Sequence, residues 1–214
     1  MARLTRAELL VATRNPAKAA ELNDIVAALG FAVTTLDAIA LPASSDEDDQ
    51  LETHDTFAAN ALAKARYYHA LSGGCPTVAD DSGLEVDALG GAPGVRSRRW
   101  TGALGDEREV SAANNAALLA RLHGLADRAA RFVCAVAYVD ASHSVTCSGY
   151  VVGRIANESR GNAGFGYDPV FEPDELGGRT FGEASPAEKA SISHRVRALA
   201  ALGQELNRRG ISGR

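Results

Sequence analysis

The sequence contains few cysteines and no hydrophobic stretch long enough to cross a membrane. Its three cysteines are an odd number without C-x-x-C spacing, so they offer no zinc site and suit a reducing compartment. The longest apolar run, Phe132 to Val139, is too short to span a bilayer. The first residues, Met1 to Glu8, lead into only a short apolar stretch and do not resemble a signal peptide. We therefore expect a cytoplasmic protein without a membrane partner.

The sequence also lacks an excess of positive charge. Its net charge of −5 argues against a nucleic acid polymer as partner, although a local group of Lys and Arg would still suit a small anionic ligand. The 214 residues, 46% hydrophobic and 23% charged, are ordinary for a soluble globular protein with a sizeable core. The acidic run Asp46 to Asp49 is most simply interpreted as a solvated loop.

Segments typical of strands alternate with segments typical of helices. Helix starts are predicted at Asn15 as N-cap with Pro16 following, at Thr56, and at Asp106 with Glu109 in a capping box. The first two helices are expected to end at Gly30 and near Leu71, and one C-terminal helical stretch is expected to run from Ser185 to about Arg208. In the helix that starts at Asp106, Leu118, Leu119 and Leu122 are expected to face the core. Strands are expected at residues 9–12, 32–36, 77–79, 84–86, 131–140 and 144–155, the last two as a hairpin. This pattern predicts a mixed α/β sheet with helices packed around it.

Two adjacent acidic residues, Asp80 and Asp81, follow the apolar residues Val78 and Ala79. Like charges side by side repel, so a divalent cation or a proton is expected to hold them. Magnesium prefers oxygen ligands, and Glu52 would complete such a site together with water and phosphate oxygens. The alternative interpretation is an acidic turn between two short strands.

The segment Thr13 to Lys18 is a predicted strand-to-helix turn that suits phosphate. Backbone N–H groups and the positive end of the helix dipole point toward this turn, and Lys18 lies one helical turn further on. The segment lacks P-loop spacing, and a simple well-capped helix is the alternative. Lys64 lies two turns into the next helix, where spacing alone favours a solvated position over one facing the acids or a phosphate.

Two later segments suit the rest of a nucleotide. In Gly164 to Pro169, glycines on both sides of Phe165 would let a flat ligand approach while the ring covers one face. A tight glycine turn with a core aromatic is the alternative. In Lys189 to Arg195, the donors Lys189, His194 and Arg195 would form one patch that reads an anion or a carbonyl, the alternative being a solvated helix surface.

Six segments occur in the order of a known family: residues 13–18, 56–65, 79–84, 90–95, 164–169 and 189–195. Together they resemble the inosine triphosphate pyrophosphatase family of the Ham1-like type, over about residues 9 to 202. The resemblance implies an elongated α/β fold, with residues 1–214 forming one catalytic domain of two lobes around a cleft, and a homodimer. It also implies a magnesium-dependent hydrolase that cleaves ITP, dITP and XTP to the monophosphate and pyrophosphate and so cleanses the purine nucleotide pool.

The resemblance also implies roles for individual residues. Asp81 would be the general base, and Glu52, Asp80 and Asp81 would bind Mg²⁺. The substrate would contact Thr13, Arg14, Asn15, Pro16, Ala17, Lys18, Lys64, Ser82, Phe165, Gly166, Tyr167, Asp168, Lys189, His194 and Arg195, the last two reading the base. One departure concerns the metal site, because many relatives carry an acid where this chain has Ala59.

Two other functions are compatible with these residues. A nucleotide pyrophosphatase of the Maf type would have a related fold but prefer pyrimidine or modified nucleotides. A non-catalytic sensor would bind the triphosphate without cleaving it, although it would gain nothing from carboxylates beside a phosphate.

Overall fold

The computed structural model describes residues 8–39 and 51–212. The acidic run Asp46 to Asp49 lies outside these residues, so its assignment to a solvated loop stays a prediction. In chain order the helices and strands are β1 (Glu8–Val11), α1 (Pro16–Ala28), β2 (Ala32–Thr35), α3 (Phe57–Leu71), β3 (Thr77–Val86), α4 (Glu107–Arg121), β4 (Ala129–Val139), β5 (Ser144–Ile155), β6 (Phe171–Pro173), α5 (Pro186–Ile192) and α6 (His194–Arg208).

The strands of the described residues form one six-stranded sheet in the order β2-β1-β3-β4-β5-β6. β1 pairs in parallel with both β2 and β3, whereas β5 and β6 are antiparallel. The neighbouring strands β4 and β5 follow one another through a short turn in which Asp140 N donates to His143 O at 3.0 Å. The predicted mixed α/β class and the predicted hairpin are therefore confirmed.

The predicted helix starts are confirmed by their capping bonds. Asn15 Oδ1 accepts from Lys18 N at 3.1 Å, and Thr56 Oγ1 accepts from Ala59 N at 3.2 Å. Asp106 and Glu109 form the expected reciprocal pair, with both bonds at 2.9 Å. Each cap satisfies backbone N–H groups that have no partner within the helix, which explains why local sequence was sufficient to place these starts.

Two other expectations about secondary structure were wrong. β3 is one unbroken strand from Thr77 to Val86, so Asp80 and Asp81 lie in its middle instead of in a turn between two short strands. The strand continues because the sheet pairs it on both sides and because each carboxylate has its own partners, described below. The C-terminal helical stretch is also interrupted, because Ser193 has extended backbone angles (φ −62°, ψ 149°) and separates α5 from α6.

The chain divides into two compact units, each assembled from separate stretches of sequence. Unit 1 comprises the chain up to Asp81, residues 134–149 and the chain from Arg195 onward; unit 2 comprises residues 82–133 and 150–194. The strands β3, β4 and β5 therefore each contribute residues to both units.

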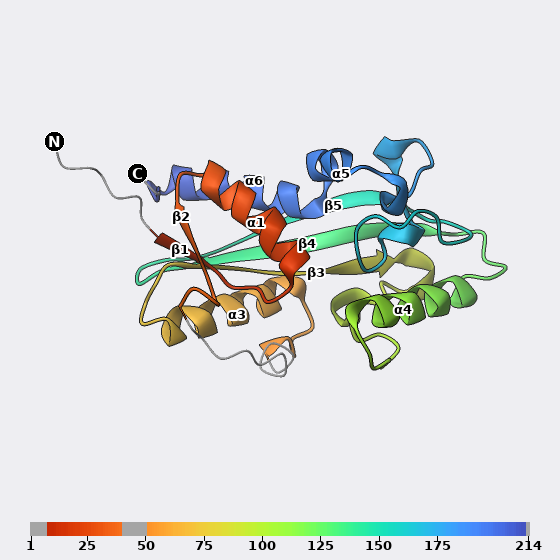
Figure 1. The fold of residues 1–214 in the computed structure, drawn as a ribbon, viewed down its shortest axis with the longest axis horizontal. Helices are drawn as coiled ribbons and strands as arrows, with labels where there is room; N and C mark the ends of the chain where they lie inside the picture. The colour runs from red at the N-terminus through yellow and green to blue at the C-terminus, as the bar shows by residue number, and fades with distance from the viewer. Residues whose placement is uncertain (1–7, 40–50, 213–214) are drawn as a thin grey trace. The chain divides into compact units, whose positions relative to one another are not determined.

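Each unit has its own hydrophobic core. In unit 1, α1 and α6 cover one face of the sheet and α3 covers the other (Figure 1). The core of unit 1 gathers buried residues from β1, α1, β4 and α6, including Leu9, Leu22, Val136 and Leu202. The core of unit 2 gathers buried residues from β3, α4, β4 and β5 and from the residues after β5, including Leu84, Leu118, Phe132, Val151 and Phe171.

None of the helices in the described part of the chain is long and apolar enough to cross a membrane.

Shortening one core side chain of α4 should destabilise the protein far more than shortening an exposed leucine nearby. Leu118 is fully buried, whereas Leu104 is 95% exposed. We expect Leu118→Ala to lower the free energy of unfolding by about 3 kcal/mol, since it removes buried methyl groups and leaves a cavity. Leu104→Ala should change it by less than about 0.5 kcal/mol. Urea unfolding followed by circular dichroism measures both, and equal effects would contradict this account of the core.

Candidate active site

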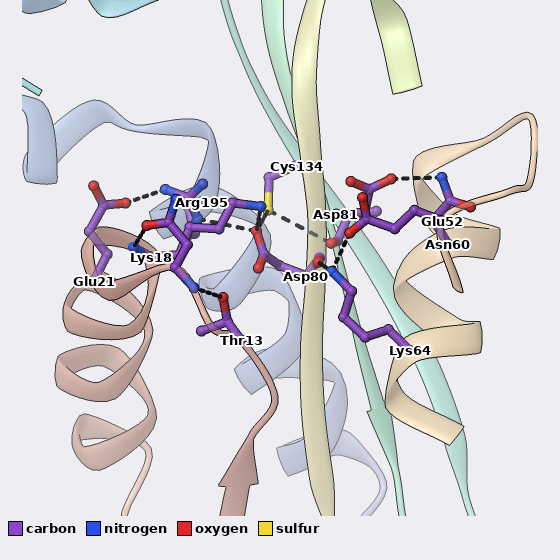
Figure 2. Close-up of polar contacts among 12 residues, drawn as sticks. Thr13, Lys18, Glu21, Glu52, Asn60, Lys64, Asp80, Asp81, Cys134 and Arg195 are labelled. Atoms are coloured by element: carbon purple, nitrogen blue, oxygen red, sulfur yellow. Dashed lines mark hydrogen bonds and ion pairs between the residues drawn. The ribbon is translucent and has the colours of Figure 1, made fainter. Parts of the chain in front are cut away.

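The carboxylate of Asp80 is buried in unit 1 and is surrounded by positive charge. Its Oδ2 lies 3.2 Å from Lys18 Nζ, at the start of α1, and 3.4 Å from Arg195 Nε, at the start of α6 (Figure 2). Burial by itself would raise the pKa of this carboxyl, but Lys18, Arg195 and Lys64 hold that pKa well below its usual range. Asp80 therefore stays ionised and ties α1 and α6 to β3.

Asp81, the next residue of β3, points to the other side of the strand, toward α3 (Figure 2). Its Oδ2 accepts a hydrogen bond from Asn60 Nδ2 of α3 at 2.9 Å. The side chain of Lys64, one helical turn after Asn60, is also buried and forms an ion pair with Glu52. Lys64 Nζ donates as well to the backbone oxygen of Asp80 at 3.1 Å.

Asp81 and Asp80 differ in electrostatic environment as well as in direction. Burial, and then the negative charge of Glu52, raise the pKa of Asp81 to about 6, although Lys18 and Lys64 act in the opposite direction. A buried carboxyl whose pKa lies near the working pH is suited to accept a proton during a reaction. The adjacent aspartates thus have separate tasks: Asp80 holds charged side chains in place, and Asp81 is the candidate base.

The predicted phosphate-binding turn lies beside Asp80. Thr13 Oγ1 accepts from Asn15 N at 3.3 Å, and the guanidinium carbon of Arg14 lies 5.9 Å from the centre of the Tyr68 ring. Pro16 and Ala17 are the first two residues of α1, and the ammonium of Lys18 lies at Asp80 as described. The turn therefore places the N-terminus of a helix and a lysine next to the acidic strand, and its role in binding phosphate stays a prediction.

The predicted magnesium ligands do not come together as one set of three. Asp80 is directed away from Asp81 and Glu52, and no group of three Asp, Glu, His or Cys side chains within residues 8–39 and 51–212 is arranged to hold a metal ion. Glu52 and Asp81 nevertheless suit magnesium, because their charges repel one another and two carboxylates plus substrate phosphates are a common set for this ion. The acidic chemistry of the site thus supports a set of two protein ligands.

The glycine-rich loop and Lys189 form a separate polar cluster in unit 2. Asp168 Oδ2 accepts from Lys189 Nζ at 2.6 Å and from Phe165 N at 2.7 Å. Lys189 Nζ also lies 4.6 Å from the centre of the Phe165 ring. Gly164 has a positive φ of 75°, and any side chain at this position would clash with the carboxylate of Asp168. The loop is thus shaped to hold an aromatic ring, a carboxylate and an ammonium together.

Four other residues were predicted to contact the substrate: Ser82, Gly166, Tyr167 and His194. Tyr167 is buried and donates its hydroxyl to Ser97 O at 2.9 Å, and Gly166 O accepts from α4 as described below. Ser82, the residue after Asp81, is half-buried. His194 stacks on Phe132 at 4.8 Å between ring centres, with the planes 9° apart.

Arg195 and Lys64 differ most from what their spacing suggested. The guanidinium of Arg195 is buried and bonds to Glu21 of α1 as well as to Asp80, so Lys189, His194 and Arg195 do not share one patch. The base-reading role of Arg195 stays a prediction. Lys64, for which spacing favoured solvent, is only 4% exposed. The preference for solvent was wrong because a buried ammonium is stable where Glu52 and a backbone oxygen surround it.

Sequence reasoning assigned no role to Asn60, Glu21, Asn114 or Asn115. One signal was present for Asn60, since it lies four residues before Lys64 and therefore shares its helix face. Glu21 lies three residues after Lys18 and therefore shares a face of α1 with it. No spacing links either residue to Arg195, which is more than 170 positions away from Glu21 in the chain.

Comparison with protein families agrees with this arrangement. The model of the Ham1 family matches residues 9–205. The chain belongs to the Ham1 family. Among its relatives in the family, the dITP/XTP pyrophosphatase of Mycolicibacterium paratuberculosis is 52% identical over 196 residues, covering 91% of this chain and 93% of the relative. The dITP/XTP pyrophosphatase of Mycobacterium tuberculosis H37Rv is 50% identical over 199 residues, with the same two coverages.

Solved structures of Ham1 proteins have the same fold. A HAM1 protein from Coxiella burnetii superposes with a TM-score of 0.80 at 35% identity, covering 94% of this chain and 99% of that one. A structure from Mycobacterium abscessus, described as a nucleoside-triphosphatase / dITP/XTP pyrophosphatase, gives a TM-score of 0.71 at 44% identity over 91% and 98% of the two chains. The mixed α/β sheet described above is therefore the Ham1 fold.

Replacing each aspartate by asparagine should affect stability in different directions. Asp80→Asn leaves Lys18 and Arg195 beside a neutral amide in a buried site, so we expect the free energy of unfolding to fall by about 3 kcal/mol. Asp81→Asn removes a charge that burial and Glu52 already disfavour, so stability should be unchanged or higher. Urea unfolding at pH 7.5 in EDTA measures both variants. An equal loss in the two would refute the division of roles.

Proposed function

We propose that this protein is a magnesium-dependent nucleoside triphosphate pyrophosphohydrolase that cleaves ITP, dITP and XTP to the monophosphate and pyrophosphate. The observation that supports this most directly is the buried carboxylate of Asp81 beside Glu52, on the strand whose other face binds Lys18. The dITP/XTP pyrophosphatases at 50% and 52% identity support the same reaction and the same purine substrates. Removal of these nucleotides from the purine pool is the proposed role.

The residues of unit 1 suit the chemical step. Asp81 accepts the proton of the attacking water, whose oxygen forms the new bond to phosphorus while the bond between the α- and β-phosphates breaks. Lys18 and the N–H groups at the start of α1 bind the phosphates and stabilise the charge on the departing pyrophosphate. Glu52 and Asp81 would hold magnesium, which when bound neutralises phosphate charge. Lys64 keeps the Glu52 carboxylate oriented.

We assign the nucleobase to residues of unit 2. Phe165 would supply a ring on which a purine stacks, and Lys189, whose ammonium lies 4.6 Å from the centre of that ring, and His194, which stacks on Phe132, would supply donors to the base. The 6-keto oxygen of hypoxanthine and xanthine accepts hydrogen bonds, whereas the 6-amino group of adenine donates them. A site built from donors therefore rejects adenine strongly. The homodimer implied by the resemblance and the cytoplasmic location expected from the sequence composition remain proposals, and size-exclusion chromatography with light scattering tests the first.

Analysis of the products tests the function directly. The protein is incubated with ITP, dITP, XTP, ATP, GTP, CTP and UTP in magnesium or in EDTA, and monophosphate and pyrophosphate are measured separately from diphosphate and phosphate. We expect monophosphate and pyrophosphate from the first three nucleotides, in magnesium only. Preference for CTP or UTP would favour a Maf-type enzyme, and binding without cleavage would favour a sensor.

Asp81→Asn should abolish nearly all turnover while the protein still binds nucleotide. The change is close to isosteric but removes the base and one proposed metal ligand, so kcat should fall at least ~100-fold. Calorimetric titration with ITP in EDTA checks that binding remains. Turnover close to that of the unmodified protein would refute the role of Asp81.

Lys18→Ala should weaken binding of the triphosphate much more than binding of the monophosphate. The ammonium meets charge on the distal phosphates, so we expect the affinity for ITP to fall about 10-fold and that for IMP to change little. Lys18→Arg is the matched control, because it keeps the charge beside Asp80. Equal losses for ITP and IMP would show that Lys18 does not contact the distal phosphates.

A further inference from the structure

Two adjacent asparagines lie buried in the middle of α4. Asn114 is 3% exposed and Asn115 is 6% exposed. Asparagine is a poor helix former, and a buried amide costs free energy unless it is hydrogen-bonded. Both side chains make hydrogen bonds outside the helix, to two separate loops of unit 2. The hydrogen bonds to these two loops therefore explain why asparagine is buried at both positions.

Asn114 binds the segment from Ser97 to Thr101. Its Nδ2 donates to Ser97 O at 3.2 Å and to Arg98 O at 3.0 Å. Its Oδ1 accepts from Thr101 N at 3.2 Å and from Thr101 Oγ1 at 2.8 Å. Four hydrogen bonds use nearly the full capacity of one amide, so this side chain fixes the backbone of the segment.

Asn115 binds the glycine-rich loop. Its Nδ2 donates to Gly166 O at 3.0 Å, the carbonyl that directly follows Phe165. Gly166 has a positive φ of 61°. Because glycine has no side chain, contacts of its own side chain cannot hold this conformation in place. The next residue, Tyr167, donates its hydroxyl to Ser97 O at 2.9 Å, in the segment that Asn114 fixes. The two asparagines therefore fix two loops that also bind one another.

The backbone on both sides of Phe165 is thus attached to fixed points. On its N-terminal side, Phe165 N donates to the Asp168 carboxylate, which Lys189 also binds. On its C-terminal side, the Gly166 carbonyl is bound to Asn115 on α4. Removing the Asn115 bond would free one side of a loop whose glycines offer little resistance to movement, and the Phe165 ring would lose its orientation.

We propose that Asn115 is a positioning residue that orients Phe165 for the nucleobase and thereby sets base selectivity, with Asn114 supporting it from the adjoining segment. This inference rests on the proposed function, in which the purine stacks on Phe165. The proposed function assigns the reacting phosphates to residues of unit 1, whereas both asparagines belong to unit 2. Loss of the Asn115 bond should therefore affect recognition of the base much more than the chemical step.

The test compares Asn115→Leu and Asn115→Ala with Leu118→Ala on the same helix. Leucine has the same branching and the same number of side-chain heavy atoms as asparagine and favours a helix, so Asn115→Leu should fold. It still removes the donor to Gly166 O. We expect KM for ITP to rise about 10-fold, the effect of losing about 1.4 kcal/mol, within the range for one buried hydrogen bond. The value of kcat should stay within about 3-fold, and the ratio of kcat/KM for ITP over ATP should fall.

Leu118→Ala separates positioning from stability. This variant loses more stability than Asn115→Leu but keeps both loop contacts, so KM and the ITP over ATP ratio should remain unchanged. If Asn115→Leu left KM and the ratio unchanged, or if Leu118→Ala changed them equally, the inference would be overturned. Absence of nucleotide cleavage by the unmodified protein would instead refute the proposed function.

A spectroscopic measurement tests the role of Asn114 without turnover. Trp100 is the single tryptophan of the chain, lies in the segment that Asn114 binds, and has Arg121 at 4.5 Å over its ring. Asn114→Leu should shift the tryptophan emission and raise KM for ITP. Leu202→Ala is the control here, because Leu202 lies in the core of unit 1 whereas Trp100 packs against the core of unit 2, and it should do neither. An unchanged emission spectrum in Asn114→Leu would show that Asn114 does not hold this segment.

Discussion

The ionised carboxylate of Asp80 is the interaction on which the arrangement of unit 1 depends. It joins β3 to Lys18 of α1 and Arg195 of α6, and Arg195 in turn binds Glu21 of α1. Burying these charges is costly, and burial of ion pairs seldom adds net stability. Their value lies in specificity, because only one placement of α1 and α6 satisfies all of them. The same placement brings the N-terminus of α1, where phosphate is proposed to bind, beside β3, which carries the candidate base Asp81.

The contrast between Asp80 and Asp81 shows how one strand serves both structure and chemistry. Successive strand residues point to opposite faces, so two neighbouring carboxylates are given different partners without any change of backbone. On one face of β3, positive charges lower the pKa of Asp80. On the other face, burial and Glu52 raise the pKa of Asp81. A carboxyl whose charged form is disfavoured, as proposed for the base Asp81, lowers the stability of the fold but is more ready to accept a proton. Such a trade-off between stability and activity is common at active sites.

Much of the fold was predictable from sequence because its signals are local. Caps at Asn15, Thr56 and Asp106 depend on residues three positions apart, and the hairpin was predicted from two neighbouring segments rich in Val and Tyr. The continuity of β3 was missed because adjacent aspartates indicate a turn when only their mutual repulsion is considered. The partners that let the strand continue, Arg195 above all, lie far away in the sequence.

The site was predictable to a similar degree. Many polar residues within the six characteristic segments were named in advance, although Asn60 was not, and the directions of their side chains were not predicted. Whether Lys64 faces solvent or Glu52 depends on packing that helix spacing leaves open. The contacts of Asn114 and Asn115 with the loops could not be predicted from the sequence. Hydrogen bonds from a side chain to distant backbone produce no periodic pattern of residues.

The distribution of unit 1 over separate stretches of chain has a consequence for its synthesis on the ribosome. Asp80 is made 115 residues before Arg195, an interval on the order of 10 s at ordinary rates of translation. Until β4 (Ala129–Val139) is made, β3 lacks its neighbour on that side, and until Arg195 is made it lacks the guanidinium that helps to balance its buried charge. In a nascent chain the edge of β3 therefore stays open only until β4 pairs with it, whereas the charge of Asp80 lacks its last counter-charge until α6 emerges.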